Sequence, residues 1–206
     1  MSEGTYWTYE GTVRWTHENS NRVSETNVTW RSEVRRFIRH GDVRAAVIRG
    51  LPSDLDWSDG SPQPSDSLLV ESRGNLYRVS DEHVEESLRR LEQPSDDLAG
   101  MLQEYDLFLK WPLQKGEKFC DAEGMARPDT MYCWFVESSL PMGDVRIAGV
   151  APARRTAYVI IYRTNPDHIQ FTFVPGIGMT AYEYHHHGTV ADTKLNLIEF
   201  HNSSAN

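Results

Sequence analysis

The stretch NVTWRSEVRRFIRHGDVRAAVIRG, residues 27–50, decides the fold class. Its first half alternates with a period of two residues, the spacing at which side chains of a β-strand reach the same face. The apolar face carries Val28, Trp30, Val34 and Ile38, and the polar face carries Thr29, Arg31, Glu33 and Arg35. One polar face indicates an antiparallel strand with one side in water. The turn HGD (residues 40–42) and the strand-like VRAAVIRG after it complete a β-hairpin.

The same strand pattern extends along most of the chain. Strand-like segments, many joined by turn signals, lie at residues 5–16, 67–72, 76–80, 106–113, 131–138, 156–164, 169–174 and 179–200. Roughly nine or ten strands without an alternating strand–helix pattern predict an antiparallel meander. A sheet of that size is expected to curl, because strand twist keeps it from staying flat. We therefore predict a single mainly β (α+β) domain over residues 1–206, with a large curved antiparallel sheet that forms a half-barrel or barrel.

A helical insert at about residues 80–105 interrupts the strands. Val84, Leu88 and Leu91 recur at i, i+4 and i+7, which predicts an amphipathic helix that Pro94 ends. A second short helix is expected after it, so the insert holds one or two helices. We expect the insert to cover one side of the sheet, as a plug or lid over its open side.

The segment LPSDLDWSDGSPQPSD, residues 51–66, has the composition of a loop. Three prolines and several Ser and Asp residues punctuate it. We predict a surface loop that is too polar to be buried.

Charge and cysteine content narrow the classes of function. The formal net charge is −9, which disfavours nucleic acid as a partner because phosphate binding needs clustered Lys and Arg. No stretch approaches the ~18 apolar residues of a transmembrane helix.

Cys120 and Cys133 lie outside any CxxC motif, so a zinc knuckle is not expected. Their segments could pair as neighbouring strands, and a disulfide between them remains open.

The run HHHG, residues 185–188, has two interpretations. On a strand, His185, His187 and Glu183 share one face, and two imidazoles about 7 Å apart can converge on a metal ion such as zinc. His168, Asp129, Glu199 and His201 are further candidate ligands of unknown distance. Alternatively, the run is an ordinary hairpin turn with Gly188 at positive φ, which we favour.

Aromatic residues on the strands suggest where an apolar ligand could bind. The chain has six Trp and nine Tyr. Our candidate ligand-binding residues are Trp30, Trp134, Tyr182 and Tyr184, which could line a concave surface. Packing in an ordinary core is the alternative explanation for all four.

Three segments carry a resemblance to a known group of proteins. YWTYEGTVRW (residues 6–15) resembles the W-x-Y-x-G strand that opens many uncharacterised bacterial envelope proteins. FVPGIGMTAYEYHHHGTVADTKLNLIEF (173–200) is similar to their ending. WPLQKGEKF (111–119) resembles a PL-x-x-G-x-x-W segment between the two, with Phe119 in place of Trp. The resemblance implies an exported or lipoprotein-like β-rich domain, although no lipidated cysteine lies near the start.

These observations lead to a functional hypothesis and two alternatives. We expect a non-catalytic binding or structural module of the bacterial cell envelope, or a secreted one without its leader, that holds an apolar small molecule or a partner protein. A cytoplasmic location is the alternative. No GxSxG, Walker or dinucleotide motif points to catalysis, and we assign no catalytic residue. The rival hypotheses are a zinc-dependent hydrolase built on His185 and His187, and a subunit of a larger complex.

Overall fold

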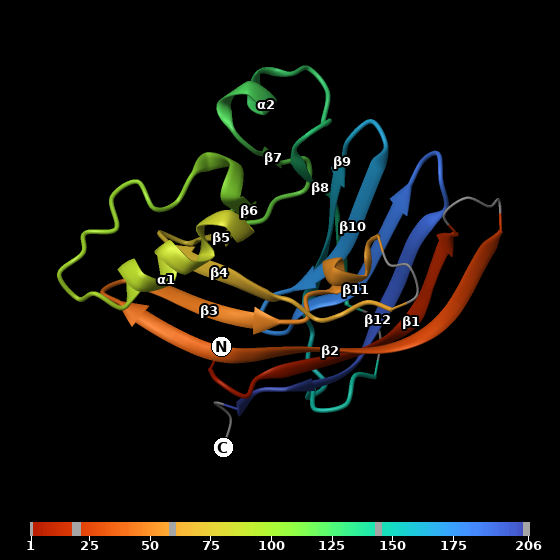
Figure 1. Cartoon of the computed structure of the whole chain (residues 1–206), viewed down its shortest axis with the longest axis horizontal. Coiled ribbons are helices and arrows are strands. Elements are labelled where there is room, and N and C mark those ends of the chain that lie inside the picture. Colours follow the sequence, from red (N-terminus) through yellow and green to blue (C-terminus); the bar gives the residue numbers. More distant parts are fainter. Residues whose placement is uncertain (1, 18–21, 58–60, 143–145, 204–206) are drawn as a thin grey trace.

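A computed structural model describes residues 2–17, 22–57, 61–142 and 146–203. Within these ranges twelve strands form one antiparallel sheet that curls into a nearly closed barrel (Figure 1). The strands are β1 (Tyr6–Thr16), β2 (Val23–His40), β3 (Val43–Arg49), β4 (Asp66–Ser72), β5 (Asn75–Val79), β6 (Leu107–Leu109), β7 (Lys118–Phe119), β8 (Trp134–Pro141), β9 (Thr156–Arg163), β10 (Asp167–Val174), β11 (Gly178–His186) and β12 (Ala191–His201). The predicted fold class is confirmed, with more strands than predicted.

The first and last strands lie side by side in the middle of the sheet. The strand order is β6-β5-β4-β3-β2-β1-β12-β11-β10-β9-β8-β7. We call β1–β6 the first wing and β7–β12 the second wing. Gly11 of β1 permits the close approach of β12, because a Cβ there would lie 1.8 Å from the carbonyl oxygen of Lys194. The two edge strands, β6 and β7, are consecutive in the sequence.

Strand β2 bends the first wing. Its first part pairs with β1 as far as Glu33, and its second part pairs with β3, with an irregularity in the register between Val34 and Arg36. One extra residue at a bulge exchanges the two faces of the strand beyond it. Val34 and Phe37 therefore pack in the interior, whereas Ile38 packs with the opposite cluster. The prediction that Ile38 shares the face of Val34 is wrong for this reason.

The sheet has apolar residues on both faces of the first wing. The inner face, which both wings turn toward the interior of the barrel, contributes Ala46 and Ile48 to the main core. Ala45 and Val47 alternate with them and belong to a second cluster on the outer face. That cluster includes Leu91 of the helical insert. The insert thus covers one side of the sheet as predicted, but it lies on the outer face and is not a lid over the barrel interior.

Helical structure is limited within the described residues. The segments are η1 (Pro52–Leu55), η2 (Asp81–His83), α1 (Val84–Leu91), η3 (Glu104–Asp106) and α2 (Ala122–Ala126). The second helix of the insert does not form: Asp96 binds Arg90 and accepts a hydrogen bond from the backbone N–H of Leu98 (2.7 Å), which competes with helical bonding. None of the helices in the described ranges has the length and apolar composition needed to cross a membrane.

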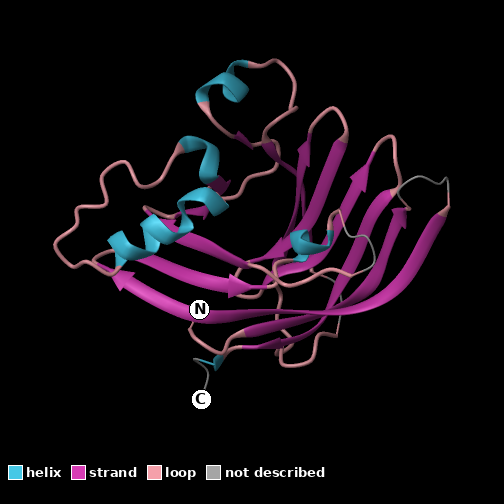
Figure 2. Ribbon diagram, viewed as in Figure 1, coloured by secondary structure: helices cyan, strands magenta, loops and turns pink. Residues whose placement is uncertain are grey.

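The loop between β3 and β4 enters the barrel. Leu51 and Leu55 are buried, with Leu55 only 1% exposed, and η1 lies between the two wings (Figure 2). The hydroxyl of Thr193 on β12 donates to the carbonyl oxygen of Leu55 (3.1 Å). The prediction of a surface loop is therefore wrong for residues 51–55, where three apolar side chains outweigh the polar composition. Residues 58–60 of this loop lie outside the described residues.

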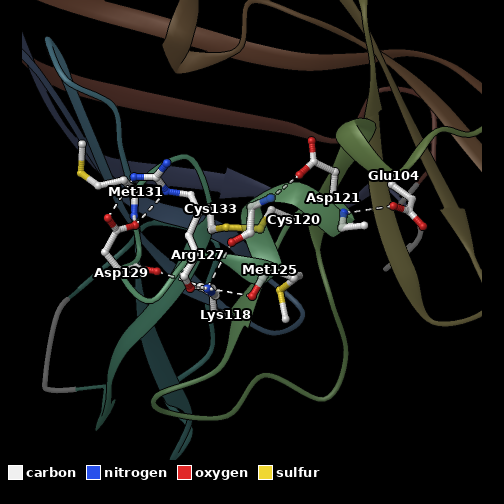
Figure 3. Close-up of a disulfide and its surroundings, with 11 residues drawn as sticks. Glu104, Lys118, Cys120, Asp121, Met125, Arg127, Asp129, Met131 and Cys133 are labelled. Carbon is white, nitrogen blue, oxygen red and sulfur yellow. Dashed lines mark hydrogen bonds and ion pairs between the residues drawn. A yellow bond between two sulfur atoms is a disulfide. The ribbon is translucent and has the colours of Figure 1, made fainter.

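Cys120 and Cys133 form a disulfide that closes a small loop beside the second wing (Figure 3). The loop wraps around the ammonium group of Lys118. Four backbone carbonyls accept hydrogen bonds from its Nζ, those of Gly124, Met125, Arg127 and Asp129 at 2.8–3.3 Å. The cation thereby satisfies carbonyl groups that no β ladder uses.

Candidate ligand-binding site

An apolar cavity of about 230 Å³ lies on the inner face where the wings meet. Most of its wall is aliphatic or aromatic. The described lining residues are Thr5, Trp7, Tyr9, Ser32, Ile48, Leu51, Leu69, Leu76, Phe108, Phe173, Gly176, Ile177, Gly178, Met179, Phe200 and Asn202. Both wings and the β3–β4 loop contribute to it, so the cavity depends on the folded barrel.

The aromatic side chains of β1 present apolar surface to this cavity. The indole N–H of Trp7 donates to the carbonyl oxygen of Ile177 (2.5 Å), and the hydroxyl of Tyr9 donates to that of Met179 (3.1 Å). Burial raises the pKa of Tyr9, so its hydroxyl stays protonated. Gly178 (φ +110°) lies against the Trp7 indole, where a Cβ would be 3.2 Å from Nε1. Because the polar ends are bonded to backbone, the rings leave an apolar wall.

A second cavity of about 230 Å³ adjoins the first and is more polar. We call it the mixed cavity. Its described lining residues are Leu51, Ser53, Arg78, Tyr105, Asp106, Leu107, Phe108, Trp134, Tyr162, Ile169, Phe171, Met179 and Tyr182. Leu51, Phe108 and Met179 line both cavities, and these three side chains form the boundary between them. Together the two fall in the roughly 300–1,000 Å³ range of small-molecule sites.

Arg78 is the one cationic side chain among the described residues that line the two cavities. It alternates with Tyr77 and Val79 on β5, and Val79 packs in the outer cluster, so Arg78 shares the inner face with Leu76. Its Nη1 donates to the hydroxyl oxygen of Ser53 (3.1 Å). The structure records no ion pair for Arg78 with any described carboxylate.

Asp56 and Tyr182 join the β3–β4 loop to the second wing. The Tyr182 hydroxyl donates to Oδ2 of Asp56 (2.5 Å), and the buried Oδ1 of Asp56 has no partner among the described residues. Burial raises the pKa of Asp56 to about 8, against the lowering effects of the Tyr182 hydrogen bond and of Arg78. Burial, and then the neighbouring Asp56, raises the pKa of Tyr182 well above its usual value. Both groups are therefore mostly neutral at pH 7.

The four aromatic residues predicted to bind a ligand are not brought together at one place. Trp134 and Tyr182 both line the mixed cavity. Trp30 lies outside both linings, and its indole N–H donates to the carbonyl oxygen of Gly50 (2.9 Å). Tyr184 is buried and donates to Asp167 (2.7 Å). The ligand-binding role of these residues stays a prediction.

The histidine run ends a strand and begins a hairpin turn. Strand β11 ends at His186, β12 begins at Ala191, and Gly188 has φ +130° in the connection, as the turn interpretation predicts. His185 and His187 share a face, with ring centroids 4.6 Å apart.

The neighbours of these side chains bear on the metal hypothesis. His185 is bound to Asp192, and Glu183 pairs with Lys194 (3.0 Å). Two other candidate ligands have neighbours of their own: His168 lies opposite His185 in the sheet, and Asp129 pairs with Arg127. The last two candidates, Glu199 and His201, both contact Tyr6, which donates a hydrogen bond to Glu199 and stacks on His201. No group of three or more His, Cys, Asp or Glu side chains in the described part of the chain is placed to hold a metal ion. The metal site remains a prediction.

Sequence reasoning missed Leu51, Asp56 and Arg78. Leu51 and Asp56 fall in a segment whose prolines and serines indicate a surface loop. Arg78 belongs to the predicted strand LYRVS, in which Tyr77 and Val79 form the more apolar face. The alternation gave no sign that the face with Arg78 turns inward.

The fold and the cavities define a barrel-like β protein with a largely apolar interior. No protein-family model and no curated protein matches the chain. Among solved structures it is similar to a "putative lipoprotein" from Parabacteroides distasonis ATCC 8503, at 12% identity over 97% of this chain and 96% of that chain, with a TM-score of 0.42. It is also similar to a "putative exported protein with YmcC-like fold" from Bacteroides fragilis NCTC 9343, at 10% identity over 98% and 97%, with a TM-score of 0.46. Both likenesses are distant.

Proposed function

We propose that the protein is a non-catalytic binding module of the bacterial cell envelope that holds an apolar small molecule inside its barrel. The observation that carries this proposal is the apolar cavity between the wings. Its wall combines aliphatic and aromatic side chains from both wings. Removing apolar surface of a ligand from water contributes roughly 25 cal/mol per Å².

Most polar groups in the wall of the apolar cavity are buried or already hydrogen-bonded. This favours a ligand that is apolar where it contacts this wall. Thr5 and Ser32 are each only 2% exposed. The Ser32 hydroxyl donates to the carbonyl oxygen of Gly50 (2.5 Å). Trp7 and Tyr9 are bonded to backbone carbonyls as described above. Few unsatisfied polar groups are left to compete for a ligand, so apolar contact dominates recognition there.

Two observations support a location outside the cytoplasm. The disulfide between Cys120 and Cys133 is typical of oxidising compartments. The motifs at residues 6–15 and 173–200 resemble those of bacterial exported and lipoprotein-like domains. A partner protein bound on the same inner face is the alternative occupant.

Solvent extraction of the purified native protein tests the proposal. The protein is purified without detergent, extracted with organic solvent, and the extract is analysed by mass spectrometry. We expect an apolar molecule in near-stoichiometric amount, released only after unfolding. An extract indistinguishable from that of a control protein, together with failure of the refolded protein to take up any neutral apolar probe, would contradict the proposal.

A further inference from the structure

We infer that the ligand is an amphiphile whose chain occupies the apolar cavity and whose anionic head group, a carboxylate or a phosphate, binds Arg78 in the mixed cavity. This inference rests on the proposed function and narrows it to a class of ligand. Its basis is the position of Arg78, the one cation among the described lining residues, at one end of two adjoining cavities.

The placement of Arg78 favours an anionic partner. Arg78 is half-buried on the inner face, so its guanidinium loses part of its contact with water, and an anion or further acceptors would compensate for that loss. Ser53 supplies one acceptor. Arginine binds carboxylate and phosphate oxygens in two-pronged geometry, so either head group fits its donors.

The recorded partners of Asp56 and Asp106 are groups other than Arg78. Asp56 is mostly protonated at neutral pH because burial raises its pKa to about 8. Asp106 also lines the mixed cavity, but its two oxygens accept from the backbone N–H groups of Ser80 (3.3 Å) and Gln103 (3.2 Å). Neither forms an ion pair with Arg78 that the structure records.

The two cavities together match an amphiphile, because the mixed cavity is polar and open to solvent whereas the adjoining cavity is apolar. Tyr105, which lines the mixed cavity, is 60% exposed, so this end meets solvent. Leu51, Phe108 and Met179 line both cavities, so the two cavities meet at three apolar side chains. A chain that enters past these three side chains leaves its head group beside Arg78.

Displacement of the neutral dye Nile red tests the inference. The competitors are a fatty acid, an alkyl phosphate and a primary alcohol of equal chain length, each below its critical micelle concentration. The proteins are the wild type, Arg78→Gln, and the control Arg35→Gln, whose arginine is exposed and lies at the bulge of β2. Nile red binding by each variant shows that its cavity is intact.

We expect the wild type and R35Q to bind at least one anion about 10- to 100-fold more tightly than the alcohol, and R78Q to lose that preference. The anion that binds more tightly identifies the head group. Equal affinity for all three competitors in the wild type, or an unchanged preference in R78Q, would overturn the inference and leave the proposed function standing. If Nile red and every competitor fail to bind the wild type, the proposed function fails with it.

Discussion

The hydroxyl of Tyr182 donates a 2.5 Å hydrogen bond to Oδ2 of Asp56, and this bond fastens the β3–β4 loop to the inner face of β11. Residues 51–55 of the loop lie in the space between the wings. Leu51, at its start, lines both the apolar and the mixed cavity. The shape of the candidate site therefore depends on a loop that is held by the buried Leu51 and Leu55 and by a few polar contacts.

Removing the Tyr182 hydroxyl should loosen this loop. Tyr182→Phe leaves the buried carboxyl of Asp56 without its donor, and we expect the free energy of unfolding to fall by about 1–3 kcal/mol. Urea denaturation followed by Trp fluorescence measures the change. Tyr158→Phe is the control, since its hydroxyl makes no recorded hydrogen bond, and it should cost less than about 0.5 kcal/mol. Equal effects of the two substitutions would contradict a special role for the Tyr182–Asp56 bond.

Asp56 should make stability depend on pH. Its pKa is about 8 in the folded protein, against an ordinary value of 3.8. The folded state therefore binds more protons between these values, so the free energy of unfolding should fall as pH rises from about 4 toward 8, by at most ~1.4 kcal/mol per pH unit. This stabilisation is complete below the ordinary value and is lost above pH 8.

Asp56→Asn isolates that contribution. The amide oxygen still accepts from Tyr182 but does not titrate, so the variant should lack this part of the slope. All other ionisable groups are the same in the two proteins, so the difference between their curves reports Asp56. Unfolding is measured at several pH values between 5 and 8.5. Parallel curves for the two proteins would show that Asp56 is ionised in the folded state across this range.

The disulfide should stabilise the protein by constraining the unfolded chain. Replacing both Cys120 and Cys133 by Ser should lower the free energy of unfolding by about 3 kcal/mol, as expected for a loop of this length. Wild-type protein unfolded with a reductant should behave like the double variant. A double variant as stable as the oxidised wild type, insensitive to reductant, would contradict a structural disulfide.

Metal analysis separates the binding module from the rival hydrolase. His185 is engaged by Asp192 and Glu183 by Lys194, so we expect less than about a tenth of an equivalent of zinc after dialysis. The control is His185→Ala together with His187→Ala, which should leave the metal content unchanged. A full equivalent of zinc that disappears in this variant would instead favour the metal-dependent enzyme.

Sequence periodicity predicted the strands well because each has at least one buried face. The hairpin at residues 27–50 and the turn at Gly188 follow from local rules. The bulge near Arg35 does not, since Arg35 and Arg36 are both compatible with either register. A missed signal lies in the runs AAVI (45–48) and LLV (68–70). Their continuous apolar sequence indicates burial on both faces of the sheet, and hence a helix that covers the outer face.

The candidate site was harder to predict because it depends on contacts between distant segments. Leu51 and Asp56 meet Met179 and Tyr182 only when the wings close. Trp30 was predicted to contact a ligand because it lies on an apolar strand face, but it lines neither cavity. Its indole N–H donates to the carbonyl oxygen of Gly50 instead. Alternation identifies which side chains share a face, and the closure of the barrel decides which of these line a cavity.

Equilibrium binding of Nile red to a variant with a filled cavity tests the central claim most directly. Leu76→Trp adds bulk to the apolar cavity wall, whereas Leu140→Trp adds the same bulk at an exposed position on β8. Unfolding curves for both variants verify that they are folded. We predict that L76W binds the dye at least about tenfold more weakly than the wild type and that L140W binds it unchanged. Undiminished binding by folded L76W, or no saturable binding by the wild type, would contradict an apolar site inside the barrel.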